Sequence, residues 1–329
     1  MKISHPTPRK MRKAASLIRA GGIVAFPTET VYGLGADAFN PVAVARLFEA
    51  KGRPLFDPLI VHIADLSQLA VVASSVNRIA GRLAGRFWPG PLTMVLPKHE
   101  RVPEIVTAGL PTVAVRMPDH LIAQDLIRRA DTPIAAPSAN RFGHLSPTRA
   151  EHVLAQLGDR VDMIIDGGDC PVGVESTIVK IEEDVCLLLR PGGVPVEDIE
   201  AVVGPLIRPP ETDTPESPGR LPSHYAPSVP VIIAESAERI DFHREDAGFL
   251  LFRGPQAETP AGRTEILSRK GDLREAAANL FAALHRLERL PIRVIITESV
   301  PERGLGIAIM DRLRRAAAGA TADVQEGVR

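Results

Sequence analysis

The amino-acid sequence predicts an α/β protein with two domains. Its 329 residues exceed what a single hydrophobic core usually organises. Short apolar runs alternate with helical patterns through the first two thirds, which is typical of an α/β sheet. A stretch rich in proline, serine and acidic residues then precedes a shorter α/β region. We therefore expect a first domain at 1–207, a linker at 208–230 and a smaller domain at 231–329.

The first region contains seven short apolar runs that predict strands. They are IVAF, PLIVHI, PLTMVL, TVAVRM, PIAAP, MIID and STIVKI. Helices are expected at 10–20 and at 41–50, where apolar residues recur at helical spacing. Another helix should begin near Thr148, with Glu151 three residues later completing a capping box.

The second region repeats the alternation on a smaller scale. The runs VIIA, GFLLF and VIITE predict strands. Amphipathic helices are expected from about Asp272 to Leu290 and from Gly304 to Ala318. Alternating strands and helices of this kind predict a Rossmann-like α/β domain.

Composition favours a folded protein whose ligands are not primarily nucleic acids. Hydrophobic residues make up 45% and charged residues 24% of the chain. A net charge of -1 and 4% aromatics supply neither a basic field nor many platforms for stacking bases. The run Arg9, Lys10, Arg12 and Lys13 could contact RNA weakly, although it equally suits a solvated helix face.

The cysteines and the hydropathy pattern predict a cytoplasmic protein. Cys170 and Cys186 have no paired spacing, and the first residues do not read as a secretion signal. Charges or prolines interrupt every apolar stretch before it reaches the roughly 20 residues that span a bilayer. No membrane association is expected.

The common nucleotide-binding and hydrolase motifs are absent from the sequence. There is no GxxxxGK[ST] loop, no GxGxxG after a strand, no HExxH and no GxSxG. A nucleotide site would therefore consist of scattered basic side chains, hydroxyls and backbone amides.

Two segments near the N-terminus could form part of such a site. Thr28, Glu29 and Thr30 follow an apolar strand, where they face a ligand or simply satisfy a turn. Lys51-Gly52-Arg53-Pro54 ends a helix and places two cations beside a glycine. This pair could clamp a polyphosphate, or it could only complement the helix dipole.

Further candidates lie at the ends of predicted strands. His62 lies in an apolar strand, where a buried structural histidine is the ordinary interpretation. Arg116 ends another strand and needs an anionic partner, for which a substrate carboxylate is one candidate. Ser138 and Ser146 follow PIAA, at a strand end of the kind where α/β sheets bind ligands.

The later candidates follow glycine-rich turns. DGGDCPVGVEST brings backbone amides to Ser176, and Arg190 precedes Pro191-Gly192, although such turns are also common in purely structural loops. In the linker, Tyr225 in SHYAP could dock on a site or pack on the second domain.

The order of these motifs resembles one known family. KGRP, PLIVH, PGPLT, VRMP, PSAN, GVEST and LRPG occur in the order found in the YrdC-type threonylcarbamoyl-AMP synthases. SHYAP and the second region resemble the long, two-domain form of that family. The resemblance implies a twisted open sheet with a deep concave active-site face. It also implies synthesis of threonylcarbamoyl-AMP and pyrophosphate from L-threonine, bicarbonate and ATP, which supplies the tRNA threonylcarbamoyl-transfer machinery.

The resemblance also implies residue roles, with Lys51 and Arg53 as the catalytic cations. The implied L-threonine-binding residues are Thr30, His62, Arg116, Ala136 and Ser176, with Arg116 gripping the carboxylate. The implied ATP-binding residues are Lys51, Arg53, Asp57, Thr112, Ser138, Ser146, Arg190 and Tyr225. Mg²⁺ is expected to accompany ATP, and no protein ligand for it can be named. Asp57 departs from the family, which commonly has asparagine there.

The expected chemistry joins a carbamate to an adenylate. The threonine amine captures CO2 derived from bicarbonate, the carbamate oxygen attacks the α-phosphorus of ATP, and pyrophosphate leaves. Because water would destroy the mixed anhydride, the 208–230 linker is expected to act as a lid.

Two other functions remain open from the sequence. One is an RNA-binding or ribosome-associated module that uses the arginines of a concave surface. The other is a carbamoyl-adenylate enzyme with a different acceptor.

Overall fold

The computed structural model describes residues 3–183, 185–210, 217–219, 225–254 and 259–318. The chain forms two compact units. The first comprises Met1–Phe142, Pro147–Pro171 and Glu175–Leu221, and the second comprises Gly143–Ser146, Val172–Val174 and Pro222–Arg329. Much of the expected 208–230 lid lies outside the described residues, so that role stays a prediction.

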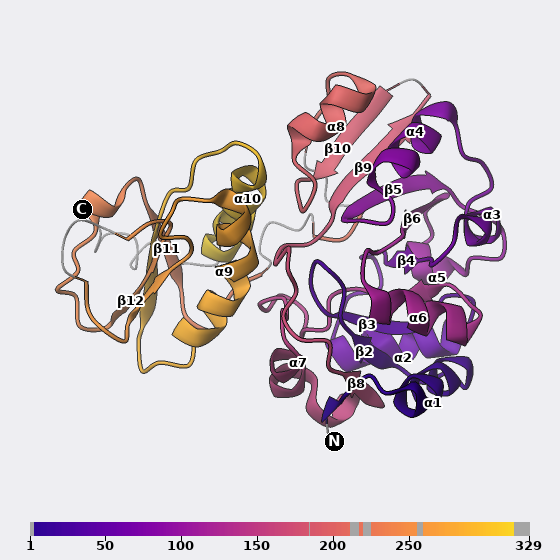
Figure 1. Cartoon of the computed structure of the whole chain (residues 1–329), viewed down its shortest axis with the longest axis horizontal. Coiled ribbons are helices and arrows are strands. Elements are labelled where there is room, and N and C mark those ends of the chain that lie inside the picture. The colour runs from indigo at the N-terminus through magenta and orange to yellow at the C-terminus, as the bar shows by residue number, and fades with distance from the viewer. Residues whose placement is uncertain (1–2, 184, 211–216, 220–224, 255–258, 319–329) are drawn as a thin grey trace. The chain divides into compact units, whose positions relative to one another are not determined.

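The described residues of the first unit include a mixed, ten-stranded sheet (Figure 1). In spatial order its strands are β1 Ile3–Ser4, β8 Met163–Ile165, β2 Val24–Phe26, β3 Gly33–Asp37, β7 Ile134–Ala135, β4 Ile60–His62, β6 Thr112–Arg116, β5 Leu92–Pro97, β9 Thr177–Glu182 and β10 Val185–Arg190. All seven expected apolar runs contain strands. The GLGAD segment, which is not among those runs, forms a further strand, β3, antiparallel to β2 and β7.

Helices surround this sheet. They are α1 Pro8–Arg19, α2 Pro41–Lys51, α3 Leu69–Val72, α4 Arg78–Phe87, α5 Glu104–Thr107, α6 Leu121–Ala130, α7 Ala150–Leu157 and α8 Val196–Val203, with short 3-10 turns η1 Leu66–Gln68 and η2 Gly158–Arg160. The apolar faces of α1 and α6 pack with β2, β7 and β8 in one core cluster that includes Ile18, Phe26, Ile127 and Ile165. Between β4 and β10, a smaller cluster of Ile60, Val95, Ala114, Ile178 and Leu189 covers the sheet.

Local signals set the ends of α2. The Asn40 side chain accepts hydrogen bonds from the backbone of Val42 and Ala43, and Pro41 occupies the first turn. Gly52 ends the helix with φ of 63°, a left-handed conformation that glycine adopts without strain. This ending places Lys51 in the last turn and directs the chain toward Arg53.

The capping box expected at Thr148 is wrong. The helix α7 begins at Ala150 after Arg149, without a side-chain cap. Instead, the backbone N–H of Thr148 donates to His152 Nδ1 at 3.3 Å. His152 therefore accepts the hydrogen bond from the Thr148 backbone that the capping box would have given to Glu151.

The second unit contains a four-stranded parallel sheet within its described residues. Its strands, in order, are β11 Val231–Ala234, β14 Val294–Glu298, β12 Ala247–Leu251 and β13 Thr264–Ile266; its helices are α9 Leu273–Leu287 and α10 Leu305–Ala317, with the 3-10 turn η3 Ala237–Arg239. The helices pack on each other and on the sheet. The expected α/β fold of both parts is confirmed.

Two short segments from within the sequence of the expected first domain, Gly143–Ser146 and Val172–Val174, belong to this second unit. His285 of α9 lies with Nε2 3.2 Å from the Ser146 carbonyl oxygen. A Cβ added to Gly173 would lie 2.3 Å from the carbonyl oxygen of Ala277, so α9 packs directly on that backbone. Among the described residues, every helix is too short or too polar to span a bilayer.

Candidate active site

Strand register brings polar side chains to one face of the first sheet. His62 is the direct neighbour of Arg116 across β4 and β6. Side chains alternate along a strand, so both lie on the face of Ile60 and Ala114. Thr93 of β5 pairs with Ile178 of β9, which extends this face toward Ser176.

Arg116 is buried and engaged through all three of its nitrogens. Only 3% of the residue is exposed. Nη1 donates to Thr30 Oγ1 at 2.8 Å, and Nε donates to the Gly90 carbonyl at 3.2 Å. Nη2 forms an ion pair with Glu29 Oε1 at 2.6 Å. The loop that follows β2 thus surrounds the guanidinium at the end of β6.

His62 is held neutral in the same region. Its Nδ1 lies 3.2 Å from the Ile60 carbonyl oxygen, and its ring meets Phe26 edge-on with centroids 6.3 Å apart. Burial, followed by the Arg116 charge, lowers the pKa of His62 to about 3. A neutral ring beside Arg116 can shape the pocket without repelling the cation.

Ser176 and Arg190 form a second group. Arg190 Nη2 donates to the Ser176 carbonyl at 2.9 Å, and Nη1 donates to the Pro218 carbonyl at 3.0 Å. The Ser176 hydroxyl lies 2.7 Å from Thr93 Oγ1. A guanidinium, two hydroxyls and the turn before β9 therefore meet on this face.

Lys51 connects α2 to the loop that follows β7. Its Nζ donates to the carbonyls of Ser138 and Asn140, each at 2.5 Å. Burial and then the Arg53 charge lower the pKa of Lys51 well below its ordinary value. An ammonium has three N–H donors, so one remains for an anion that would restabilise the charged form.

Arg53 and Asp57 form a buried ion pair. Arg53 Nη2 lies 2.8 Å from Asp57 Oδ2, and the side chains are 3% and 0% exposed. Arg53 also donates to the carbonyls of Asp57 and Pro58. Burial raises the pKa of Asp57, while Arg53, Lys51 and Arg190 oppose that rise. Arg53 is thus the first source of charge compensation for Asp57.

Most of the predicted site residues lie in the first unit. Ala136 is buried, and its N–H donates to the Ile60 carbonyl at 2.9 Å. Thr112 is half-buried at the start of β6, and Ser138 bridges to Gly33. The Ser138 carbonyl accepts from Lys51, whereas Thr112 begins β6 and therefore lies at the opposite end of that strand from Arg116.

Ser146 and Tyr225 instead belong to the second unit. Tyr225 is 2% exposed, with its ring centroid 5.9 Å from that of Phe281 and the Arg312 guanidinium 4.8 Å from its centroid. In this structure Tyr225 packs within the second domain, the alternative that the sequence had left open. The assignment of both residues to ATP stays a prediction.

Two polar residues in the site received no binding role from the family motifs, although Glu29 belongs to the 28–30 segment that the sequence already marked as a candidate ligand-facing loop. Glu29 pairs with Arg116, and Thr93 contacts Ser176. A signal for each existed: a charged residue directly after an apolar strand, and a hydroxyl within the otherwise apolar LTMVL run. Their partners, far away in sequence, were not visible.

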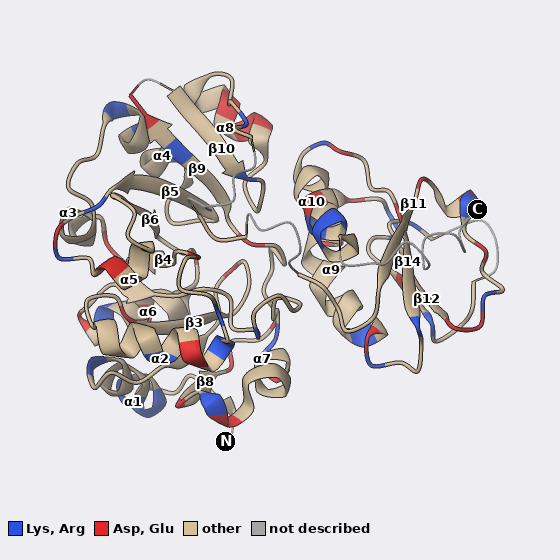
Figure 2. Cartoon of the chain, turned by 180° about the vertical axis from the view of Figure 1, so that it is seen from behind, with Lys and Arg blue, Asp and Glu red and all other residues tan. Residues whose placement is uncertain are grey.

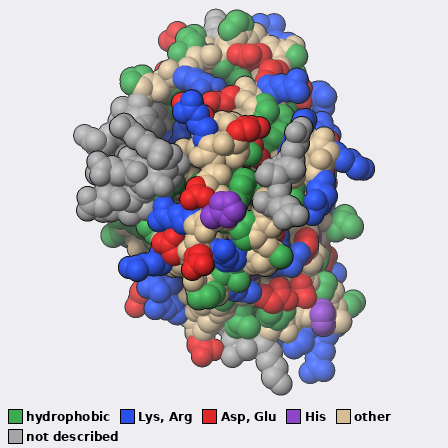
Figure 3. Space-filling view, turned by 90° about the vertical axis from the view of Figure 1, so that its left-hand side faces the viewer, with side chains coloured by type: hydrophobic (Ala, Val, Ile, Leu, Met, Phe, Trp, Pro, Cys, Tyr) green, Lys and Arg blue, Asp and Glu red, His purple; other side chains and the backbone are tan. Residues whose placement is uncertain are grey.

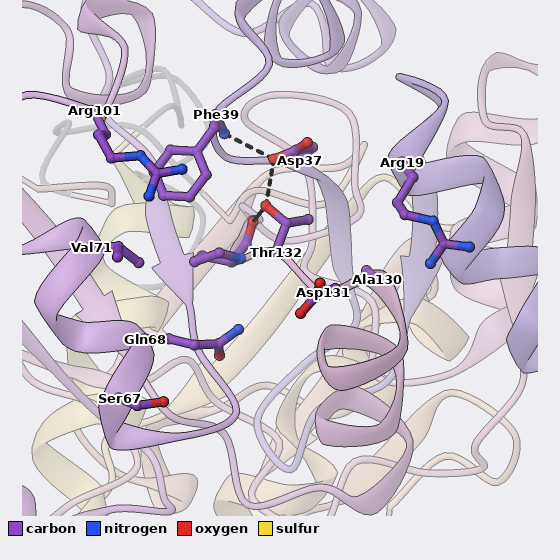
Figure 4. Close-up of a pocket in the computed structure, with 11 residues that line it drawn as sticks. Arg19, Asp37, Phe39, Ser67, Gln68, Val71, Arg101, Ala130, Asp131 and Thr132 are labelled. Carbon is purple, nitrogen blue, oxygen red and sulfur yellow. Dashed lines mark hydrogen bonds between the residues drawn. The ribbon is translucent and has the colours of Figure 1, made fainter.

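A surface pocket of about 630 Å³ lies elsewhere on the first unit (Figure 4). It opens at the Asp37 end of β3, whereas Gly33 at the other end of that strand bridges Ser138. None of the predicted site residues lines it. Asp37 accepts hydrogen bonds from Phe39 and Thr132, and Arg101 lies 4.7 Å from the Phe39 ring centroid. Because these groups satisfy one another, we place the active site on the sheet face instead.

Comparison with known proteins identifies relatives for both units. The Sua5/YciO/YrdC family model, described as "Telomere recombination", matches residues 16–192. A second model, described as "Threonylcarbamoyl-AMP synthase, C-terminal domain", matches residues 194–318.

Individual relatives match nearly the whole chain. A protein of Pyrococcus abyssi named threonylcarbamoyl-AMP synthase is 48% identical, over 93% of this chain and 94% of the relative. Its namesake in Bacillus subtilis is 46% identical, over 94% and 93%. The crystal structure of P. abyssi Sua5 complexed with L-threonine superposes with a TM-score of 0.91 at 45% identity, covering 96% of this chain and 98% of that one. The chain therefore belongs to the Sua5/YciO/YrdC family, in the form that carries the threonylcarbamoyl-AMP synthase C-terminal domain.

Proposed function

We propose that this protein synthesises L-threonylcarbamoyl-AMP and pyrophosphate from L-threonine, bicarbonate or CO2, and ATP. The observation that carries this proposal is identity of 46–48% over nearly the full length to two relatives named threonylcarbamoyl-AMP synthase. The geometry supports it, because four buried cations occur in the first unit: Arg116 and Arg190 end β6 and β10, Lys51 ends α2, and Arg53 follows that helix. Such a site suits alignment and charge stabilisation in phosphoryl transfer.

The threonine end of the site is assigned to Arg116 and its neighbours. Arg116 would bind the substrate carboxylate through the N–H groups that Thr30 and Glu29 leave available, since each terminal guanidinium nitrogen carries two hydrogens. His62, Ala136 and Ser176 would line the side-chain pocket. Support comes from the P. abyssi structure, which contains L-threonine.

The ATP end is assigned to the group around Lys51. Lys51 and Arg53 would hold the phosphates as the catalytic cations, with Arg190 beside them. Asp57 keeps Arg53 in position through their ion pair. Further contacts are assigned to Thr112, Ser138, Ser146 and Tyr225. Charge-assisted bonds from these cations would stabilise the charge that develops as pyrophosphate leaves.

We propose that Mg²⁺ enters with ATP. No cluster of three His, Cys, Asp or Glu side chains suited to a metal exists within the described residues. Asp57 is the acidic side chain among the cations, and its Oδ2 is committed to Arg53. The residues therefore fit an ion held chiefly by phosphate oxygens and water, which is the usual arrangement for Mg²⁺ at nucleotide sites. Its contribution would be to neutralise phosphate charge.

The product would pass to the tRNA threonylcarbamoyl-transfer machinery, which we place with this protein in the cytoplasm. Two free, buried thiols suit such a reducing compartment. Weak RNA contact is assigned to α1, which exposes Arg9, Lys10, Arg12 and Lys13 and appears blue in Figure 2.

A purely RNA-binding role is less well supported. Net charge is -1. Figure 3 shows Lys and Arg interspersed with Asp and Glu on the face of the second unit turned to the viewer. An RNA-binding surface normally gathers positive charge instead.

The decisive experiment measures pyrophosphate release from ATP without RNA. Release that requires both threonine and bicarbonate supports the proposal. Its absence, together with tight and salt-sensitive RNA binding, would favour the binding module. Replacing threonine with serine, valine and alanine tests the remaining alternative, because equal rates with all of them would indicate another acceptor.

A further inference from the structure

Glu29 presents a buried carboxylate oxygen that receives no hydrogen bond from a described residue. The residue follows β2 and is 5% exposed. Oε1 forms the 2.6 Å ion pair with Arg116 Nη2. Oε2 is buried, and no described residue forms a hydrogen bond with it. Because a buried polar atom without a hydrogen-bond partner destabilises the folded protein, and a charged one does so most, a bound ligand is its natural partner.

The geometry of an α-amino acid supplies that partner. Its nitrogen and carboxylate are attached to one carbon, so the nitrogen lies about 2.5 Å from the carboxyl carbon by standard bond lengths and angles. A carboxylate bound by Arg116 therefore brings the ammonium close to the acid that pairs with the same guanidinium. Resting on the function proposed above, we propose that Glu29 is the general base that deprotonates the threonine ammonium for attack on CO2.

The proposed step balances as follows. Bicarbonate takes up a proton and yields CO2 and water, while Glu29 Oε2 takes one proton from the ammonium. The nitrogen lone pair of the resulting amine forms a bond to the carbon of CO2, and a C=O electron pair moves to oxygen. Loss of a second nitrogen proton gives the carbamate. In sum, ammonium and bicarbonate become carbamate, water and one proton, and Glu29 releases its proton to solvent afterwards.

The titratable groups around Glu29 leave a clear pH window for testing this. Arg116 of β6 is permanently charged. Burial lowers the pKa of His120, at the start of α6, and Glu29 opposes this lowering, so the ring is neutral above pH 7. Burial raises the pKa of the Cys170 thiol, which therefore stays protonated. Between pH 7 and 9 the substrate amine is then the group whose titration should control a variant that lacks the base.

The first experiment compares the full-length protein with Glu29→Gln in threonine- and bicarbonate-dependent pyrophosphate release. The amide preserves shape but cannot accept the proton. We expect the kcat at pH 7 to fall at least about 100-fold, the usual contribution of a positioned base. The rate of the variant should rise about tenfold per pH unit as free amine accumulates, while the rate of the wild-type protein stays nearly flat.

The second experiment runs the reaction backwards, from threonylcarbamoyl-AMP and pyrophosphate to ATP. ATP formation in this direction precedes any return of a proton to nitrogen. Glu29→Gln should therefore retain ATP formation within about fivefold of wild type. If Glu29 merely positions Arg116, the Glu29→Gln variant should lose the forward and reverse rates equally. Its KM for threonine should then be raised at every pH.

Controls separate folding from chemistry. Glu265→Gln removes the acid of another Arg–Glu pair, at 2.7 Å from Arg286 in the second unit, and should change neither rate. Glu29→Asp keeps the negative charge that compensates Arg116. It therefore provides a folded variant if Glu29→Gln has a lower melting temperature than the wild-type protein. The aspartate withdraws its carboxylate by one methylene and should lower the forward rate at least tenfold while sparing the reverse.

The outcomes distinguish this inference from the proposed function. A wild-type protein without threonine-dependent pyrophosphate release refutes the function itself. An active wild type whose Glu29→Gln variant keeps its forward rate, or loses both directions without recovery at high pH, overturns the role of Glu29 alone.

Discussion

Arg53 is both a candidate phosphate ligand and the partner of a fully buried acid. From sequence, Arg53→Ala is expected to weaken ATP use, by about 1.5–3 kcal/mol per lost charge-assisted bond, without unfolding the protein. The structure adds a cost, because the change strands Asp57 at 0% side-chain exposure. Loss of one partner of a buried pair typically costs about 3–5 kcal/mol.

We therefore expect Arg53→Ala to lower the free energy of unfolding by about that amount and to impair ATP use. The double variant Arg53→Ala/Asp57→Asn should recover much of the stability but none of the ATP use. Urea unfolding and ATP kinetics check this. A double variant no more stable than the single one would contradict the importance of the pair.

His62 predicts a dependence of stability on acid pH. Its folded pKa of about 3 lies below the ordinary 6.5, so the unfolded state binds a proton first as pH falls. The histidine therefore contributes no penalty above pH 6.5 and progressively destabilises the folded state between pH 6.5 and 3. The slope should approach about 1.4 kcal/mol per pH unit.

His62→Gln should flatten this slope. The comparison is the free energy of unfolding at pH 4, 5, 6 and 7 for the two proteins, with exposed His243→Gln as the control. Parallel pH profiles for wild type and His62→Gln would show that His62 is protonated in the folded protein.

At the scale of elements, the turn after β10 holds the start of β9. A Cβ on Gly192 would lie 2.3 Å from the Glu175 carbonyl oxygen and 2.4 Å from the Thr177 nitrogen. Backbone contacts of this length cannot be relieved by side-chain rotation. The strand start that carries Ser176 would have to move.

Gly192→Ala should therefore cost at least about 1–3 kcal/mol of stability and raise the KM for threonine. The matched control is Gly81→Ala, an exposed position inside α4 where an added Cβ meets no atom within 4 Å. That change should stabilise the protein by about 0.5–1 kcal/mol. Equal effects of the two substitutions on denaturant unfolding and threonine kinetics would show that close packing at Gly192 is unimportant.

At the scale of the whole molecule, sequence order and compact units do not coincide. Gly143–Ser146 and Val172–Val174 belong to the second unit although the first domain surrounds them in sequence. Arg190 also donates to Pro218, beyond the expected end of the first domain. A chain ending at residue 207 would lose both sets of contacts.

We expect that shortened chain to keep its sheet, to unfold at lower denaturant than the full chain, and to form or retain less threonylcarbamoyl-AMP. Far-UV circular dichroism, urea titration and product quantification would measure the three properties. Undiminished synthesis and release by residues 1–207 would argue against a lid in the 208–230 segment.

The sequence by itself determined the α/β class, most strands of both sheets, and the family. The five-residue β3 is an exception, because its GLGAD sequence contains no apolar run. The class, the other strands and the family each depend on information that is local in the chain: apolar runs, glycines that end helices, such as Gly52, and short motifs that occur in the same order as in the family. The family motifs also predicted roles for Lys51, Arg116 and Arg190; the structure shows these residues buried, and their roles stay predictions.

Only the tertiary structure decided which groups meet. Glu29 pairs with Arg116, Thr93 contacts Ser176, and Tyr225 packs between Phe281 and Arg312. These partners are separated by tens of residues, and strand register and helix packing bring them together. Burial also decides their charge, because desolvation of Lys51 and His62 depends on every neighbour that excludes water. The sequence pattern records neither which distant residues contact each other nor how deeply each one is buried. The chemistry of the site is therefore defined only in the folded chain.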